Sequence, residues 1–428
     1  MTQVTHRELM PGVRLTSVHT DKFKTSLLSA TLVTPISAET ASANALIPSV
    51  LRRGTEAHPD MEKLSAALDD LYGGAIEPLV RKKGEVQCVG FTASFLDDAF
   101  TPDGARILEP AAGLLGELLL RPATEGGVFR KEYVEGERSN LADRIRAQIN
   151  EKRSYSLLRL TQEMCSGEPF GVDRLGDEKS AAAITPESLW ARYRELLQKA
   201  PLELYYCGSA PQERVEEALR AAFQGLPRAE KLEEPDCGVR VSSPGEVPKM
   251  VIESLDVTQG KLALGFRTGG AFIGSEDFPA LLVFNAVYGG TATSKLFLNV
   301  REKLSLCYFA SSIPEKFKGL VMVSSGIEFQ NYEKAREEIL LQLENCRAGK
   351  IEEHEMEGAR KSVTSGLRTS LDAQGRLEDF WMGQSVAGLE EGPEELALRV
   401  EGVTRDQVVA VAQKLELDTV YFLKGKEG

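Results

Sequence analysis

The chain has 428 residues, enough for about two or three domains, and its 42% of hydrophobic residues is ordinary for a globular protein. Its 51 basic and 64 acidic residues give a formal charge of -13, which disfavours a nucleic-acid backbone or an anionic membrane as partner. We find no secretory signal pattern, no uninterrupted run of about 18 apolar residues and no C-x-x-C among the six cysteines. We therefore expect a soluble, cytoplasmic protein with reduced, mostly buried thiols.

The first half of the chain predicts an alternation of strands and helices. A strand over 24–35 precedes an apolar helix that begins near Ala43, and a helix over 61–75 and strands over 75–83 and 85–95 follow. The second half repeats this order with similar lengths. Its elements are a strand over 261–268, helices over 278–290 and 294–306, strands over 307–314 and 319–329, and an amphipathic helix over 331–349.

A second unit also occurs twice, as residues 184–209 and 403–425. In each copy a threonine, Thr185 or Thr404, is placed to cap the N-terminus of a helix, and a hydrophobic strand follows and ends at glycine. The sequence therefore predicts an α+β protein of two homologous halves, each a mixed or mainly antiparallel sheet with helices on one face.

The segment between the two halves is rich in proline and charge and lacks periodicity. We interpret residues 231–248 as a linker. The predicted domains are then residues 1–230 and residues 249–428.

Histidine is scarce, which limits metal chemistry. The four histidines occur in no H-x-x-H, H-x-x-E-H or H-E-x-x-H pattern. We expect His6 and His19 to be exposed polar residues and His354 to lie on a solvated helix face. His58 follows a Gly-Thr turn without a second ligand at suitable spacing, and we interpret it as a turn residue.

The stretch from Ser294 to Ser312 is the best chemical signal. It predicts a helix whose Leu296, Phe297 and Val300 pack inward, with Arg301 on the helix and Tyr308 at the start of the next strand. A corner between helix and strand would bring the guanidinium and the hydroxyl together. From spacing alone, local pairing of each group with a nearby partner is the favoured alternative.

This segment resembles the arginine-tyrosine motif of the insulinase-like zinc peptidases, the family of pitrilysin, insulin-degrading enzyme and mitochondrial processing peptidase. That motif has the form S-[RK]-L-F-x-x-[VI]-R-E-K-x-G-L-x-Y, and Ser305 replaces its glycine. The matching residues here are Ser294, Lys295, Leu296, Phe297, Val300, Arg301, Glu302, Lys303, Leu306 and Tyr308. The resemblance covers essentially the whole chain and implies two α+β halves that form a clam-shell.

In active members of that family an H-x-x-E-H motif on the first helix binds zinc and supplies the general base. Aligned on Gly54 and Thr55, this sequence has Ala45 and Ser49 in place of the histidines and Pro48 in place of the glutamate. The resemblance thus implies no zinc on this chain. A proline inside a helix costs about 3 kcal/mol, so we expect a locally remodelled helix unless the helix begins at Pro48.

The position of the third zinc ligand falls within residues 131–148, where the register stays open. Glu137 is one residue that could occupy this ligand position, and Ser139, Asp143 and Arg144 are the alternatives. A single retained glutamate would not hold zinc, because a catalytic site needs about three protein ligands.

The resemblance implies a non-catalytic subunit that encloses a peptide or unfolded polypeptide and supplies Arg301 and Tyr308 to a site whose zinc is bound by a homologous partner with an intact H-x-x-E-H motif. Such a chain would be inactive alone, and whether it forms part of an active heterodimeric peptidase stays open. The sequence is also similar to bacterial zinc-less members associated with 5-aminopentanol modification of elongation factor P.

Two alternatives remain. One is a non-hydrolytic scaffold that binds a peptide or a partner protein. The other is a lone metallopeptidase with relocated ligands near His58.

Overall fold

The computed structural model describes residues 3–242 and 245–426, and the chain divides into two compact units. The N-terminal unit comprises Met1–Arg146, Val172–Asp236 and Gln374–Val386. The C-terminal unit comprises Ala147–Gly171, Cys237–Ala373 and Ala387–Gly428. Each unit therefore includes one segment from the opposite half of the sequence, an exchange that the internal repeat did not predict.

The N-terminal unit is built on a six-stranded sheet in the order β1-β2-β8-β3-β5-β4. Neighbouring strands are antiparallel except β2 and β8, which are parallel. The strands are β1 (Gln3–Met10), β2 (Val13–His19), β3 (Thr25–Pro35), β4 (Ala75–Lys83), β5 (Val86–Leu96) and β8 (Leu202–Gly208). A separate two-stranded ribbon pairs β6 (Thr124–Glu125) with β7 (Val128–Phe129).

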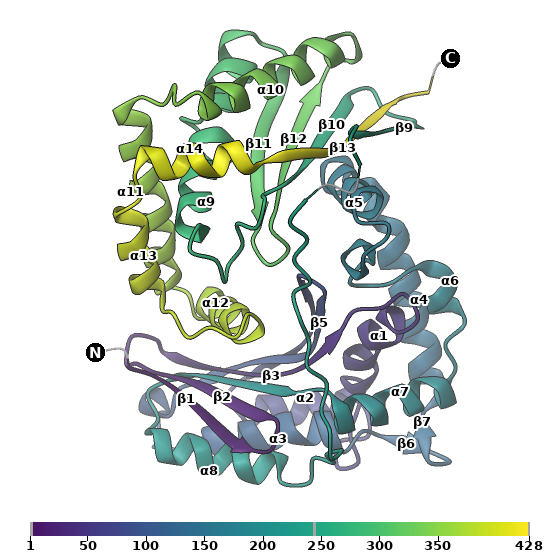
Figure 1. Cartoon of the computed structure of the whole chain (residues 1–428). Helices are drawn as coiled ribbons and strands as arrows, with labels where there is room; N and C mark the ends of the chain where they lie inside the picture. The colour runs from purple at the N-terminus through teal and green to yellow at the C-terminus, as the bar shows by residue number, and fades with distance from the viewer. Residues whose placement is uncertain (1–2, 243–244, 427–428) are drawn as a thin grey trace. The chain divides into compact units, whose positions relative to one another are not determined.

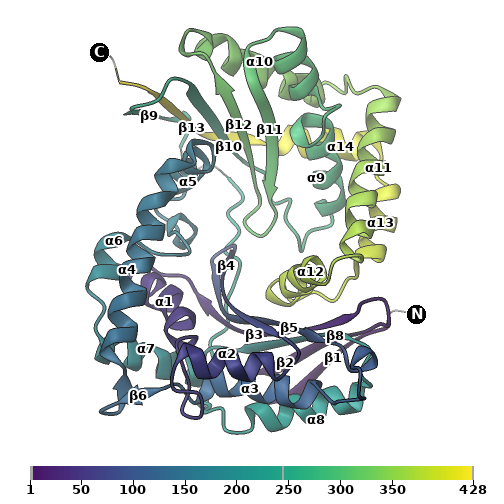
Figure 2. The same cartoon turned by 180° about the vertical axis from the view of Figure 1, so that it is seen from behind.

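Helices cover one face of this sheet, and a single exchanged helix lies on the other (Figure 1, Figure 2). Alternate residues of β3 explain the burial, since Leu28, Ala30 and Leu32 enter the large core beneath the first set of helices. Apart from α12, the α-helices of the N-terminal unit are α1 (Ala41–Leu51), α2 (Met61–Asp69), α3 (Leu108–Leu120), α4 (Lys131–Ala147), α6 (Glu178–Ala182), α7 (Pro186–Lys199) and α8 (Gln212–Phe223). The opposite face carries α12 (Gln374–Val386).

The C-terminal unit repeats the same sheet without its first strand. Its order is β11-β12-β10-β13-β9, again antiparallel except for one parallel pair, β13 with β9. The strands are β9 (Lys249–Leu255), β10 (Gly260–Arg267), β11 (Cys307–Glu315), β12 (Leu320–Ile327) and β13 (Glu416–Gly425). This order matches β4-β5-β3-β8-β2 strand for strand, which confirms the two predicted α+β halves.

The helices of the C-terminal unit also lie on both faces of its sheet. On one side Tyr332 of α10 packs on Phe422 of β13, and on the other α5 packs on β10 and β13. The helices are α5 (Lys152–Met164), α9 (Phe278–Asn285), α10 (Tyr332–Arg347), α11 (Glu353–Ser370), α13 (Pro393–Glu401) and α14 (Arg405–Lys414), and two π-helical segments are η4 (Ala286–Gly290) and η5 (Leu296–Lys303). The expectation of helices on one face only is therefore wrong for both units, because the exchanged segments cover the second face.

Local signals in the sequence account for several helix ends. Thr185 caps α7, and Thr404 with Gln407 forms the predicted capping box of α14. The helix expected over 61–75 ends at Asp69 instead, because the chain then turns through Tyr72 and Gly73, which both have positive φ.

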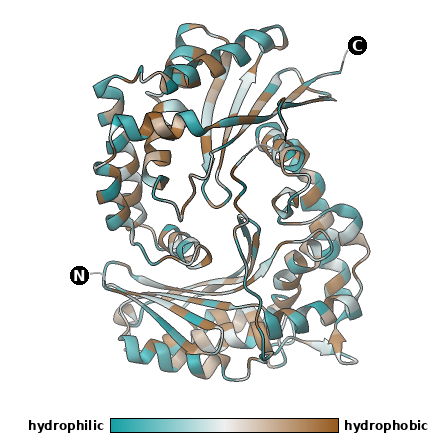
Figure 3. Cartoon of the chain, viewed as in Figure 1, coloured by the Kyte–Doolittle hydropathy of each residue, from teal (hydrophilic) through white to brown (hydrophobic). Residues whose placement is uncertain are grey.

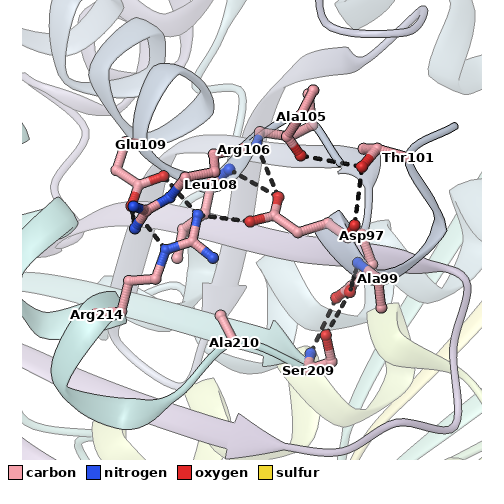
Figure 4. Close-up of polar contacts among 12 residues, drawn as sticks. Asp97, Ala99, Thr101, Ala105, Arg106, Leu108, Glu109, Ser209, Ala210 and Arg214 are labelled. Carbon is pink, nitrogen blue, oxygen red and sulfur yellow. Dashed lines mark hydrogen bonds and ion pairs between the residues drawn. The ribbon is translucent and has the colours of Figure 1, made fainter. Parts of the chain in front are cut away.

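A polar network fixes the loop that joins β5 to α3 (Figure 4). Asp97 accepts hydrogen bonds from the Ser209 and Ala99 amides at 2.9 and 3.1 Å. Arg214 of α8 forms two hydrogen bonds to Glu109 of α3, at 2.7 and 2.6 Å, and pairs with Asp98. The hydrogen bonds from Arg214 lower the pKa of Glu109 to about 2, so this clamp stays ionised at neutral pH.

Two further findings concern the cysteines and the helices. All six cysteines are buried, as predicted, and none forms a disulfide. Among the helices of the described residues, none is both long and apolar enough to cross a lipid bilayer.

Candidate functional site

Helix α1, where the resemblance places the zinc motif, is continuous. Pro48 is its eighth residue of eleven, and the Arg52 amide still donates to the Pro48 carbonyl at 3.0 Å. The expected remodelling at Pro48 is therefore wrong. Nine of the eleven residues of α1 are buried, and this burial offsets the hydrogen bond that a proline nitrogen cannot donate.

The zinc-motif positions of α1 carry no group that could bind a metal. Ala45 is fully buried in the core, and Ser49 is only partly exposed. The neighbouring Asn44 instead fastens α1 to the sheet, because its amide donates to Gln87 Oε1 at 2.8 Å and its carbonyl accepts from Arg192 Nε at 2.8 Å. The residues present do not fit zinc, which needs imidazole, thiolate or carboxylate ligands.

The candidate third ligand on α4 is also engaged elsewhere. Glu137 accepts hydrogen bonds from Arg53 at 3.3 Å and from Asn140 at 3.2 Å. The alternatives Ser139, Asp143 and Arg144 are exposed on the same helix. Within residues 3–242 and 245–426, no three His, Cys, Asp or Glu side chains are grouped so that they could hold a metal ion.

His58 lies in a turn that is tied to α3. Its Nδ1 is 3.1 Å from Glu117 Oε1, and Thr55 donates a hydrogen bond to the same carboxylate. His354 is exposed on α11, as expected. Since no metal-binding group forms around His58 in the described chain, the relocated zinc site has no structural support.

Strand β4 forms one edge of the N-terminal sheet, and arginine side chains already bind its outward-facing carbonyl groups. Arg52 Nε donates to the Ile76 carbonyl of β4 at 2.7 Å, and Arg174 Nη1 donates to the Val80 carbonyl at 2.9 Å. Pro78, at the alternate position between them, has no amide proton to offer. An incoming peptide strand needs such carbonyls and amides, so this edge is closed to strand addition while the two arginines stay in place.

The structure brings Arg301 and Tyr308 to one pocket in the C-terminal unit. Arg301 lies on η5, and Tyr308 is the second residue of β11. They line a cavity of about 380 Å³ together with Glu302, Ser305, Leu306, Cys307 and Glu328. The corner between helix and strand that the sequence predicted is therefore present.

Residue 305 explains how the chain makes this corner. Ser305 has φ of +51°, in the left-handed region that costs a non-glycine residue roughly 1–2 kcal/mol. The motif of the resembling family has glycine at this position, which adopts such a backbone freely. The replacement by serine therefore keeps the turn at some cost in stability.

Both polar groups of the pair also have local partners. Tyr308 is 60% exposed, and its hydroxyl donates to Glu328 Oε1 at 2.6 Å. This hydrogen bond raises the pKa of Tyr308, so its phenol stays protonated at neutral pH. The guanidinium of Arg301 stacks on Phe297 at 4.6 Å from the ring centroid, and its Nε is 3.5 Å from Glu302.

Of the three residues predicted to pack inward from this helix, Phe297 is the one that is not buried. Leu296 and Val300 are buried as expected, whereas Phe297 is partly exposed beneath Arg301. The π-helical geometry of η5 explains the difference, because it rotates successive side chains by less than an α-helix does.

The sequence predicted a local partner for each of the two groups, which the structure confirms, but it did not identify Glu328 as the partner of Tyr308. Glu328 follows the end of β12, whose Ile327 pairs with Cys307 at the start of β11. The hairpin of β11 and β12 could have revealed this neighbour, because antiparallel pairing places the start of one strand beside the end of the next.

Comparison with known proteins agrees with these observations. The family described as "Peptidase M16 inactive domain" matches residues 183–363. A Bacillus subtilis protein described as "Probable inactive metalloprotease YmfF" is 37% identical over 420 residues, which is 97% of this chain and 97% of that protein.

Two solved structures are similar over nearly their whole length. A conserved protein from Enterococcus faecalis V583 has a TM-score of 0.90 at 28% identity and covers 99% of both chains. A Pseudomonas fluorescens structure described as a "peptidase M16 inactive domain" has a TM-score of 0.79 at 16% identity, over 100% of this chain and 99% of its own, which is a likeness of fold. Because the Bacillus relative matches almost the entire chain, this protein belongs to the insulinase-like M16 peptidase family and is one of its inactive members.

Proposed function

We propose that this chain is the non-catalytic subunit of a cytoplasmic heterodimeric M16 peptidase. Its partner would be a homologous subunit with an intact H-x-x-E-H motif, which binds the zinc that this chain does not bind. The substrate would be a peptide or an unfolded polypeptide. The observation that carries the proposal is the shared pocket of Arg301 and Tyr308.

The chemistry of this pocket suits a supporting role. A guanidinium and a neutral phenol are hydrogen-bond donors, and such donors stabilise the negative charge that develops on a peptide carbonyl during hydrolysis. Neither group provides a nucleophile or a metal ligand here. Zinc-bound water on the partner would supply that part of the reaction.

The test measures peptide hydrolysis by this chain, by an H-x-x-E-H homologue and by their mixture. We expect activity only in the mixture, and a loss of about 10²-fold or more in kcat with Arg301→Ala or Tyr308→Phe, the size found for single oxyanion donors. Co-elution on size-exclusion chromatography checks that both variants still assemble.

The chain offers a matched control pair on α10. Arg336 lies over the Tyr332 ring at 5.6 Å, outside the pocket. We expect Arg336→Ala and Tyr332→Phe to leave hydrolysis by the mixture unchanged. Equal losses in the pocket and control variants would contradict a role for the pocket.

A second candidate is a scaffold that binds a peptide or protein without hydrolysis. The local pairings of Tyr308 with Glu328 and of Arg301 with Glu302 favour it, because both donors are already engaged. Assembly with a homologue but unchanged activity in the Arg301 and Tyr308 variants would support this candidate.

A further inference from the structure

Helix α12 rests on a polar face of the N-terminal sheet. Since Leu28, Ala30 and Leu32 of β3 point into the core, Ser29 and Thr31 point to the opposite face, where α12 packs on β3 and β8. A small apolar cluster contributes there, in which Met382 of α12 meets Val33, Val86 and Cys88.

Charged and polar contacts hold α12 instead. Arg81 Nη1 lies 2.6 Å from Glu378 Oε2, and Lys83 Nζ lies 2.9 Å from Asp379 Oδ1. At the far end of the helix, Ser385 donates to Glu203 Oε2 at 2.7 Å. Ion pairs that reach solvent weaken as salt is added, and Asp379 is half-exposed.

Several buried polar atoms at this interface have no hydrogen-bond partner among the described residues. Each such atom costs roughly 1–3 kcal/mol while it stays buried. They are Ser29 Oγ, Thr31 Oγ1, Glu378 Oε1, Trp381 Nε1 and Gln384 Oε1. Release of α12 would return these atoms to water, which offsets part of the free energy of the contacts that dock the helix.

The connections of α12 permit such a movement. Among the described residues that follow residue 236, those of α12 are the only ones that belong to the N-terminal unit. The helix is joined to its neighbours by short turns, one of which contains Gly388 at φ of +68°. The helix can therefore leave the sheet without breaking a strand pair or another helix.

We propose that α12 is a releasable cover, held by the Arg81–Glu378 and Lys83–Asp379 pairs, whose undocking exposes the polar face of β3 and β8. This device needs neither zinc nor a partner chain, so it stands apart from the proposed peptidase role.

The chain carries its own reporter of docking. It has two tryptophans, and Trp381 lies buried on α12 while Trp190 lies on α7. In a Trp190→Phe chain, all tryptophan fluorescence reports on α12. We expect acrylamide quenching of Trp381 to rise about threefold or more between about 0.05 M and 0.5 M sodium chloride, since this range shortens the reach of charge interactions several-fold. Circular dichroism checks that the rest of the chain stays folded.

Two further measurements make the test decisive. A disulfide between Glu203→Cys and Ser385→Cys, which replaces a direct contact, is expected to abolish the salt effect, while the reduced form retains it. In the unmodified protein, hydrogen exchange of α12 amides is expected to be at least about tenfold faster than that of α5 amides, because local opening precedes global unfolding. Quenching that stays low at every salt concentration, together with equal exchange of the two helices, would overturn the proposal.

Discussion

The two exchanged helices, α5 and α12, cover equivalent faces of two equivalent sheets but are held in different ways. Near the end of α5, Glu168 accepts from Arg267 Nη2 at 2.6 Å and pairs with Lys318 at 2.7 Å. Arg267 also donates to Asp418 at 3.0 Å. All four side chains are at most 4% exposed, and each charge has a partner.

The cluster under α12 also joins an arginine and a lysine to two carboxylates, in other surroundings, but within the described chain it has no counterpart of Arg240, which pairs with Glu168 near α5. Glu378 is fully buried, yet Arg81 is 27% and Asp379 51% exposed. One oxygen of Glu378 has no hydrogen-bond partner among the described residues. Figure 3 shows both hydrophilic and hydrophobic residues along α12.

Apolar packing around α5 is a further difference between the two helices. Leu160 of α5 joins a buried cluster with Ala263, Tyr421 and Leu423. A Cβ added at Gly265 would lie only 2.5 Å from Met164 Sδ, so α5 approaches β10 closely. From this difference we expect an ion-pair cluster to fix a helix most firmly where apolar packing and complete hydrogen bonding exclude water.

The largest loss of unfolding free energy is expected from breaking the ion-pair cluster near the end of α5. Arg267→Met leaves Glu168 and Asp418 buried without their main partner, which costs about 3–5 kcal/mol of unfolding free energy. Urea unfolding, followed by hydrogen exchange of β10 amides, measures this loss. Arg336→Met, on the surface of α10, is the control, with an expected change below about 1 kcal/mol.

Acid should weaken the same cluster. Burial by itself would raise the pKa of Glu168, but hydrogen bonds from Arg267 and Lys318 outweigh it and lower the pKa. A lowered folded pKa gives stability that is complete above the unfolded value of about 4.3 and is lost as pH falls through the folded value. Unfolding free energies measured from pH 7 to pH 3 should therefore fall below about pH 4.5. Glu168→Gln should flatten this slope, and an unchanged slope would contradict the assignment.

A smaller loss is expected under α12. Arg81→Met would leave the buried Glu378 unpaired, but release of the helix lets this carboxylate reach water. We expect about 1 kcal/mol or less of lost global stability, with faster exchange of α12 amides. A loss as large as that of Arg267→Met would show that α12 is as firmly held as α5.

The last expected effect is a gain in stability. Thr31→Val removes a buried hydroxyl that has no partner among the described residues, so stability should rise by on the order of 1 kcal/mol. Thr34→Val is the matched control on the same strand, because the Thr34 hydroxyl donates to Glu233 and accepts from Arg192. The control should lose stability in the same urea titration, and two changes of the same sign would contradict this reasoning.

Sequence patterns predicted the repeated halves, the main strands and the helix caps at Thr185 and Thr404, because these depend on short-range periodicity and local hydrogen bonds. They also predicted the corner that joins Arg301 to Tyr308. The replacement of zinc ligands by Ala45, Pro48 and Ser49 stays a prediction from the family resemblance.

Other features needed the fold. Continuity of α1 through Pro48 depends on burial by the surrounding core, and the closed edge of β4 depends on Arg174, which is far from that strand in sequence. Neither feature can be predicted from neighbouring residues in the sequence, since each arises from contacts between distant segments.

The sequence by itself determined the family and the α+β repeat, because these are properties of residue order and spacing. Only the tertiary structure decided which helix covers the second face of each sheet and how the charges beneath it are buried and paired. The physical reason is that the strength of a charge pair depends on its burial and on its neighbours, and both are set by distant parts of the chain.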